Sequence, residues 1–198
     1  MKLLRSVAAS LGFLAILLCT YYVHIAFFKV NVVLYSAVLD AVIAVSIGAA
    51  MVFLLKPFSI FSAFERYQLL VIWLLVGYVF AISIPTVIDR SLSFYILEKL
   101  QQRGGGIRLD RFEDVFTREY VKEHHLVDVR LTEQEESGTI IIKDGCVMLT
   151  QRGANLASFS RFFRQHLLPK QRLLMGTYSD ALTDPFRNSE PDRGYSCH

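Results

Sequence analysis

The chain has 198 residues, 53% of them hydrophobic, and a formal net charge of +3, so it has room for one ordinary domain or for a small domain with an anchor. That charge is too small to indicate nucleic-acid binding by itself. Residues 1–88 are nearly devoid of charge, whereas residues 89–198 carry most of the charged side chains. This division predicts a membrane part followed by an aqueous part.

Three apolar stretches of the first part are long enough to cross a membrane as helices: residues 6–28, 32–55 and 67–88. A hydrocarbon core of roughly 30 Å needs about 20 helical residues. The basic start, Met1 to Arg5, leaves a cleaved signal peptide as the alternative for the first stretch, but a second apolar stretch follows directly and favours a membrane helix. Pro85 predicts a kink near the end of the third helix.

Asp40 is the one acidic residue inside a predicted span. A charged carboxylate near the middle of a bilayer costs about 2.5–3.5 kcal/mol on insertion scales, so such a residue is normally partnered or protonated. One interpretation is a proton relay or ligand-coordinating acid, and the other is a polar contact that fixes helix packing, within this chain or with a partner subunit. We favour the second interpretation because the sequence pairs no other intramembrane acid or base with Asp40.

Asp40 shares a helical face with small residues that would let another helix approach closely: Ala37, Ala41, Ala44 and Gly48. We expect this face to be an interaction surface. Aromatic and imidazole side chains near the first membrane turn are expected to form an interfacial belt: Tyr21, Tyr22, His24 and Tyr35.

The stretch from Ser137 to Gly153 predicts a β-hairpin. Two β-rich runs, Thr139–Ile142 and Cys146–Thr150, flank the turn Lys143-Asp144-Gly145, and Asp-Gly readily takes the positive φ angles of a tight turn. Helical patterns precede and follow the hairpin, and Leu-Thr-x-x-Gly closes its second strand. This order resembles the wing of the winged-helix family over about Ser91 to Leu168.

The resemblance implies a small α+β winged-helix-like domain at 89–168, behind a three-helix membrane domain at 1–88 and before a flexible polar tail at 169–198. Its third helix is expected at Tyr120–Glu136, with Val127 and Leu131 facing inward. Winged helices serve both as DNA readers and as protein docking modules.

Charge decides between these two uses of the third helix. DNA reading requires cations there, but this region holds six carboxylates against Lys122 and Arg130: Glu119, Glu123, Asp128, Glu133, Glu135 and Glu136. The acidic surface argues against DNA binding and favours protein docking, with Glu133, Glu135 and Glu136 as candidate contacts. Basic residues later in the chain could equally lie against anionic lipid.

The orientation of the chain in a plasma or inner membrane follows from weak signals. Lysine and arginine are equally frequent on the two sides, so the positive-inside rule is tied. Cys19, Cys146 and Cys197 form no disulfide framework and are predicted to be free thiols. Together with the winged-helix resemblance, they place the C-terminal domain in the cytoplasm.

No catalytic, cofactor-binding or metal-binding motif occurs in the sequence. We therefore expect a non-catalytic accessory or scaffolding subunit without cofactor, metal or small-molecule substrate. It would dock a larger integral membrane protein within the lipid bilayer, and an enzyme of envelope or glycan assembly is the suggested client. The alternative is a membrane-anchored winged-helix transcription regulator.

Overall fold

The computed structural model describes residues 2–187. By its internal contacts the chain divides into two compact units, Met1–Tyr120 and Val121–His198. The sequence predicted a boundary after residue 88, with a winged-helix-like domain at 89–168 and a polar tail at 169–198. The units are described separately below.

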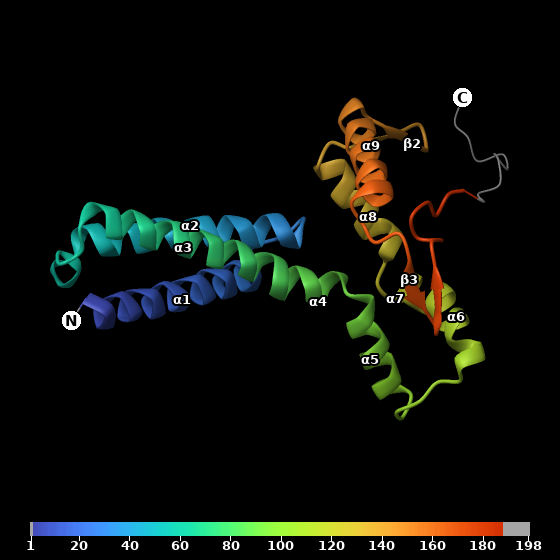
Figure 1. Ribbon diagram of the computed structural model, residues 1–198, viewed down its shortest axis with the longest axis horizontal. Coiled ribbons are helices and arrows are strands. Elements are labelled where there is room, and N and C mark those ends of the chain that lie inside the picture. Colours follow the sequence, from blue (N-terminus) through green and yellow to red (C-terminus); the bar gives the residue numbers. More distant parts are fainter. Residues whose placement is uncertain (1, 188–198) are drawn as a thin grey trace. The chain divides into compact units, whose positions relative to one another are not determined.

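The first unit contains three long apolar helices that pack side by side (Figure 1): α1 (Lys2–Phe27), α2 (Val33–Leu54) and α3 (Ala63–Ala81). By length and composition each is able to cross a membrane, the third with its continuation to Arg90. The prediction of three helices that are long and apolar enough to span a membrane is therefore confirmed. Many of their apolar side chains are exposed, including Leu11, Val42 and Leu75, as expected for surfaces that lipid covers.

The third helix begins earlier than predicted because a capping box stabilises its first turn. The backbone N–H of Glu65 donates to Oγ of Ser62 at 3.3 Å, and the N–H of Ser62 donates to Oε2 of Glu65 at 2.7 Å. The short 3-10 helix η1 (Lys56–Phe58) precedes this turn. A turn at residues 59–62 connects η1 to α3.

The third helix is interrupted around Pro85 by a π-helical turn, η2 (Ile82–Thr86). This turn leads into α4 (Val87–Arg90). Proline lacks the N–H that would bond the carbonyl four residues earlier, at Ala81. The hydroxyl of Thr86 donates to that carbonyl instead, at 2.8 Å. The carbonyl freed by the proline is therefore satisfied inside the helix.

Beyond the membrane helices the first unit continues with short helical elements: α5 (Leu92–Gln102), η3 (Leu109–Arg111), α6 (Phe112–Asp114) and the π-helical η4 (Val115–Tyr120). The ring of Tyr95 lies 4.6 Å from that of Tyr120, centroid to centroid, and both residues are buried. Lys99, also buried, forms an ion pair with Glu119 at 2.7 Å. These contacts join α5 to η4.

The second unit begins with α7 (Val121–Glu123) and α8 (Leu126–Glu136). His125 has a φ of 44°, in the left-handed region, and separates the two helices. The single helix predicted over Tyr120–Glu136 is therefore broken. Val127 is 57% exposed, so its predicted inward position is wrong, whereas Leu131 is half-buried.

The predicted hairpin is confirmed as β1 (Ile140–Lys143) and β2 (Cys146–Leu149), paired antiparallel with Lys143 opposite Cys146. Asp144 and Gly145 take positive φ angles of 52° and 76° in the turn. This is the geometry that an Asp-Gly turn was expected to supply.

The Leu-Thr-x-x-Gly motif joins the hairpin to α9 (Gln151–His166). Oγ1 of Thr150 caps the helix by accepting the N–H of Gly153 at 3.1 Å, and it also donates to the carbonyl of Gly138 at 2.8 Å. A Cβ on Gly153 would lie 2.1 Å from the carbonyl oxygen of Thr139. The motif therefore requires glycine because two backbone segments meet there.

Two expectations for the end of the chain need correction. The predicted flexible tail at 169–198 contains a second hairpin, β3 (Arg172–Leu174) and β4 (Thr177–Ser179), and its part beyond residue 187 lies outside the described residues. Cys146 is disulfide-bonded, so the prediction that it is a free thiol is wrong; Cys19 is free. The cytoplasmic placement of the C-terminal domain thereby loses one of its two supports.

Candidate functional site

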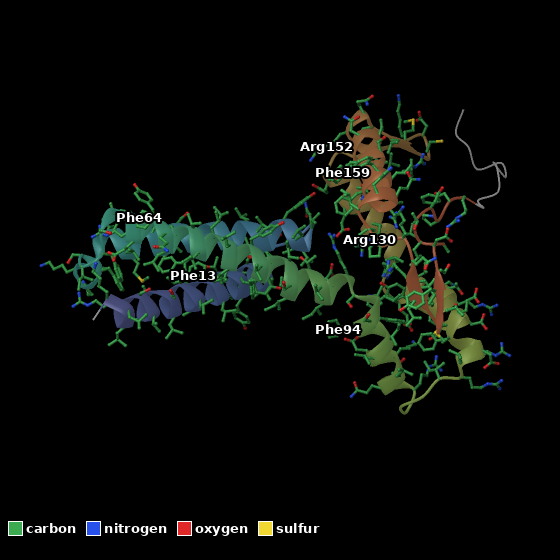
Figure 2. All side chains as sticks on the ribbon, in the orientation of Figure 1. Phe13, Phe64, Phe94, Arg130, Arg152 and Phe159 are labelled. Carbon is green, nitrogen blue, oxygen red and sulfur yellow. The ribbon has the colours of Figure 1, made fainter. Side chains whose placement is uncertain are left out.

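The interior of the membrane bundle is built on close contacts of small residues with aromatic rings. The rings of Phe13 and Trp73 stack at 5.1 Å, and Nε1 of Trp73 donates to Oγ of Ser10 at 3.0 Å. Trp73 lies directly over Gly48, where an added Cβ would meet its ring at 2.9 Å. Figure 2 shows Phe13 between the helices, whereas Phe64 points away from them.

The small-residue face predicted around Asp40 is buried inside this bundle. Ala37, Ala41 and Ala44 are at most 2% exposed, and a Cβ on Gly77 of α3 would lie 2.7 Å from Cβ of Ala41. The face thus lets α1, α2 and α3 of this chain approach one another. Of the two possibilities that the sequence left open for Asp40 and this face, packing within the chain and packing with a partner subunit, the contacts seen here are within the chain.

Asp40 has a partner that the sequence analysis missed. Nδ1 of His24, near the end of α1, lies 2.7 Å from Oδ1 of Asp40 on α2. The Asp40 side chain is 1% exposed and that of His24 is 18% exposed. When Asp40 is ionised its carboxylate can only accept, and the imidazole N–H is then the donor.

This pair corrects two sequence interpretations. Asp40 was taken to be without a second intramembrane acid or base, and His24 was assigned to an interfacial belt. The two residues are 16 positions apart, and both lie within a few helical turns of the connection between α1 and α2. Neighbouring antiparallel helices bring such positions together, a relation that hydrophobic periodicity along one helix does not reveal.

A groove between α1 and α2 runs beside the pair. Its volume is about 420 Å³, within the range of roughly 300–1,000 Å³ for small-molecule pockets, and it is lined by Cys19, Thr20, Val23, His24, Phe28, Leu39, Asp40 and Ile43. Oδ2 of Asp40 is buried and has no hydrogen-bond partner within the described part of the chain. The groove therefore has mostly apolar walls, and one of its lining residues, Asp40, has an unsatisfied acceptor just beneath the surface.

The arrangement offers one kind of chemistry, which is acceptance of a hydrogen bond by Asp40. Oδ2 can accept a hydrogen bond from a hydroxyl, amide or ammonium group that enters the groove, because the low dielectric there makes an unpaired acceptor costly. Among residues 2–187, no group of three His, Cys, Asp or Glu side chains is placed to hold a metal ion. We name the pair with its groove the His24–Asp40 site.

The acidic candidates for docking lie on α8 in the second unit. Glu135 and Glu136 are exposed, whereas Glu133 is half-buried and accepts a hydrogen bond from Arg130 at 2.7 Å. Glu119, counted with them in the sequence, lies on η4 in the first unit. Hydrogen bonds from Lys99 and Arg103 lower the pKa of Glu119, so this carboxylate is used within α5 and η4.

Comparisons with known proteins add no family to this picture. No protein-family model matches the chain, and searches of curated proteins and of solved structures return no significant match.

Proposed function

We propose that this protein is a non-catalytic integral membrane subunit that docks to a larger membrane protein. One observation carries the proposal: a buried carboxylate oxygen of Asp40 has no partner among residues 2–187, and Asp40 is one of the residues that line a groove at the surface of the bundle. An unpaired carboxylate oxygen is costly in an apolar environment. A hydrogen-bond donor supplied by another molecule would remove this cost.

The size of the groove indicates what the partner inserts. An α-helix with its side chains is about 10–12 Å across, far more than a groove of about 420 Å³ between two packed helices accepts. One side chain with a donor at its end, such as Lys, Ser or Asn from a neighbouring helix, suits the space and the free acceptor. Docking through this groove replaces the earlier hypothesis of docking through the small-residue face.

The C-terminal part of the chain is proposed to be a winged-helix-like docking module. The order of its elements supports this: helices α5, α6 and α8 precede the β1–β2 hairpin, and α9 follows it. The exposed carboxylates of Glu135 and Glu136 suit a basic surface on the partner. Membrane enzymes of envelope or glycan assembly are the suggested clients.

The test is affinity purification of the intact chain in a gentle detergent, with mass spectrometry of the proteins that accompany it and nuclease treatment as a control. The decisive variant is Asp40→Asn. It retains an oxygen for the imidazole N–H of His24 but replaces the free acceptor by an NH₂ donor, which would face the partner's donor. Asp89→Asn is the matched control, because Asp89 is exposed near the end of the same bundle.

We expect a stoichiometric membrane partner that survives nuclease, is lost or strongly depleted with Asp40→Asn, and is retained with Asp89→Asn. A partner that Asp40→Asn retains but deletion of residues 91–168 removes would show that docking does not use the His24–Asp40 site. Recovery of the chain alone, or with a DNA fragment that nuclease removes, would overturn the subunit proposal.

A further inference from the structure

The segment from Gly145 to Ser179 has an unusual charge distribution. It contains no aspartate or glutamate, whereas its cations are Arg152, Arg161, Arg164, Lys170 and Arg172. None of these five side chains has an ion-pair or hydrogen-bond partner within residues 2–187. Four of them are exposed, and Arg164 is half-buried. Within residues 2–187, the positive charges of this segment are therefore not neutralised by direct ion pairs.

Helix α9, inside this segment, also exposes a large apolar arc. Leu156, Phe159, Phe163 and Leu167 recur at the spacing of one helical face, and each is at least 40% exposed, with Phe159 at 60%. Phe162 borders the same arc and stacks on His166 at 4.6 Å. Contiguous exposed aromatic surface of this kind marks an interaction site in a water-exposed unit.

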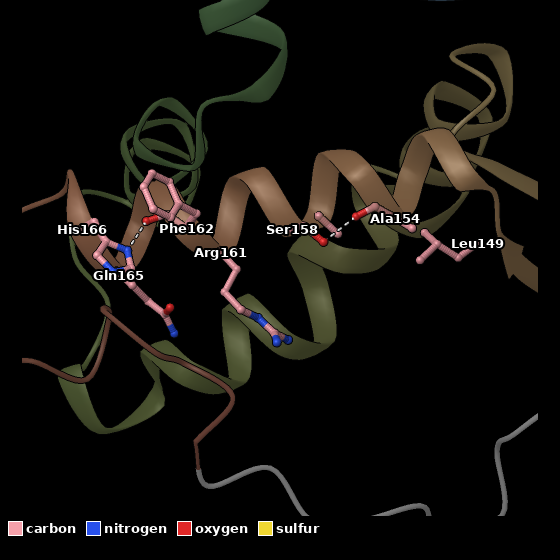
Figure 3. A pocket seen from close by; sticks show the side chains of 8 residues that line it. Leu149, Ala154, Ser158, Arg161, Phe162, Gln165 and His166 are labelled. Atoms are coloured by element: carbon pink, nitrogen blue, oxygen red, sulfur yellow. Dashed lines mark hydrogen bonds between the residues drawn. The ribbon is translucent and has the colours of Figure 1, made fainter.

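On α9, Arg164 borders this arc, Arg152 lies in line with it in the first turn, and Arg161 lies on the opposite side of the helix. Figure 3 shows Arg161 and Gln165 extending from one side of the helix. A shallow pocket of about 390 Å³ follows that side, with Leu149 at one end and His166 at the other. The helix therefore presents aromatic side chains next to free guanidinium groups.

We propose that α9 and the strands after it bind an anionic lipid surface of the membrane that the same chain crosses. An amphipathic helix with aromatic residues on one face and cations at its borders places the rings at the headgroup boundary and the cations against lipid phosphates. Nucleic acid would pair with the cations but leave the aromatic arc in water. The five cations of the segment have no ion-pair partner within residues 2–187, although Asp184 lines a pocket together with Arg161 and Arg164, so the segment is complementary in charge to a continuous anionic layer.

The three membrane helices strengthen this contact by tethering. Because the second unit is covalently attached to a membrane-embedded unit, its encounter with the bilayer is intramolecular and the effective lipid concentration is high. A modest intrinsic affinity of α9 for lipid is then sufficient. The contact does not depend on the docking proposed for the His24–Asp40 site.

The test is hydrogen–deuterium exchange of the full chain in nanodiscs of phosphatidylcholine alone or mixed with phosphatidylglycerol. We expect exchange of residues 151–168 to slow several-fold in the anionic nanodiscs, and the effect to weaken at about 1 M salt, where the Debye length falls to about 3 Å. Peptides from α8 serve as the internal reference.

Two variants make the outcome specific. The triple change Arg161→Glu, Arg164→Glu and Arg172→Glu should abolish the difference between the two lipid compositions. The double change Lys122→Glu and Lys143→Glu, at exposed positions of the same unit, should retain it. Equal exchange in both nanodiscs would overturn the proposal. Slow exchange that is seen in native membranes but in neither nanodisc would also overturn it, because a protein partner would then cover the surface.

Discussion

At the scale of single residues, His24 and Asp40 affect the stability of the bundle as a pair, so the effect of changing one depends on whether the other is present. The imidazole satisfies one oxygen of a carboxylate that is 1% exposed. Removing one member of a buried ion pair leaves the other uncompensated, whereas replacing both by apolar residues is often neutral or stabilising. The pair therefore provides a way to separate stability from function.

We predict that His24→Leu destabilises the bundle by about 3–5 kcal/mol, because both oxygens of Asp40 would then lack a partner. The double variant with His24→Leu and Asp40→Leu should recover most of the loss. Reversible unfolding in mixed micelles measures both. If the double variant is no more stable than His24→Leu, the loss comes from helix packing rather than from an unpaired carboxylate.

Glycines of the bundle give a second residue-scale prediction. A Cβ at Gly77 would lie 2.7 Å from Cβ of Ala41, whereas at Gly12 it would meet only the flexible end of Met51, at 3.6 Å. We expect Gly77→Ala to separate α2 from α3 and lower stability by about 1–3 kcal/mol. Gly12→Ala is the matched control and should be neutral or stabilising by about 0.5–1 kcal/mol, because alanine favours helix.

The same unfolding assay compares the two glycine variants. Equal stability of Gly77→Ala and Gly12→Ala would contradict the close approach of α2 and α3. Both positions lie in membrane helices and both substitutions add one methyl group, so the difference isolates the contact.

At the scale of elements, the joint between α5 and η4 depends on one carboxylate. Lys99 and Arg103 of the α5 region both reach Glu119, which lowers the pKa of Glu119 from its ordinary value of 4.5. A group whose folded-state pKa is depressed contributes stability above its unfolded pKa. The stability that Glu119 contributes is therefore lost as the pH falls below 4.5 and then through the lower pKa that Glu119 has in the folded state.

We therefore predict that amide exchange in residues 92–120, corrected for its intrinsic pH dependence, increases as the pH is lowered through this window. In Glu119→Gln the acid dependence should be weaker, and exchange at neutral pH should be faster than in the unchanged protein. Glu113→Gln, which removes an exposed carboxylate in the same region, serves as the control. An unaltered acid dependence in Glu119→Gln would refute the role of this carboxylate.

The sequence predicted elements well where one local pattern was sufficient. Asp144-Gly145 fixed the position of the hairpin turn, and apolar length fixed the three membrane helices. The break at His125 was missed because a left-handed residue other than glycine leaves no compositional mark. His24 was missed because its role depends on which two helices are neighbours, which residue spacing within one helix does not contain.

At the scale of the whole molecule, the two units raise a question about the extent of the C-terminal domain. The winged-helix-like proposal unites α5 and α6 with the hairpin, although the division by contacts falls at Tyr120. If the proposal holds, a soluble fragment of residues 91–187 should unfold cooperatively, and its β1–β2 amides should exchange several-fold more slowly than those of a fragment 121–187. Equal exchange in the two fragments would favour the division at Tyr120.

The three helices of the bundle have a topological consequence that holds for either orientation. The connection between α1 and α2, near which His24 and Asp40 meet, and the end of the third helix at Arg90 lie on the same face of the bilayer, because the chain crosses twice between them. The unsatisfied oxygen of Asp40 is therefore nearest to the face where α5 begins. A partner confined to that one leaflet can reach both the groove and the emerging chain, so recognition needs no element that traverses the full thickness of the membrane.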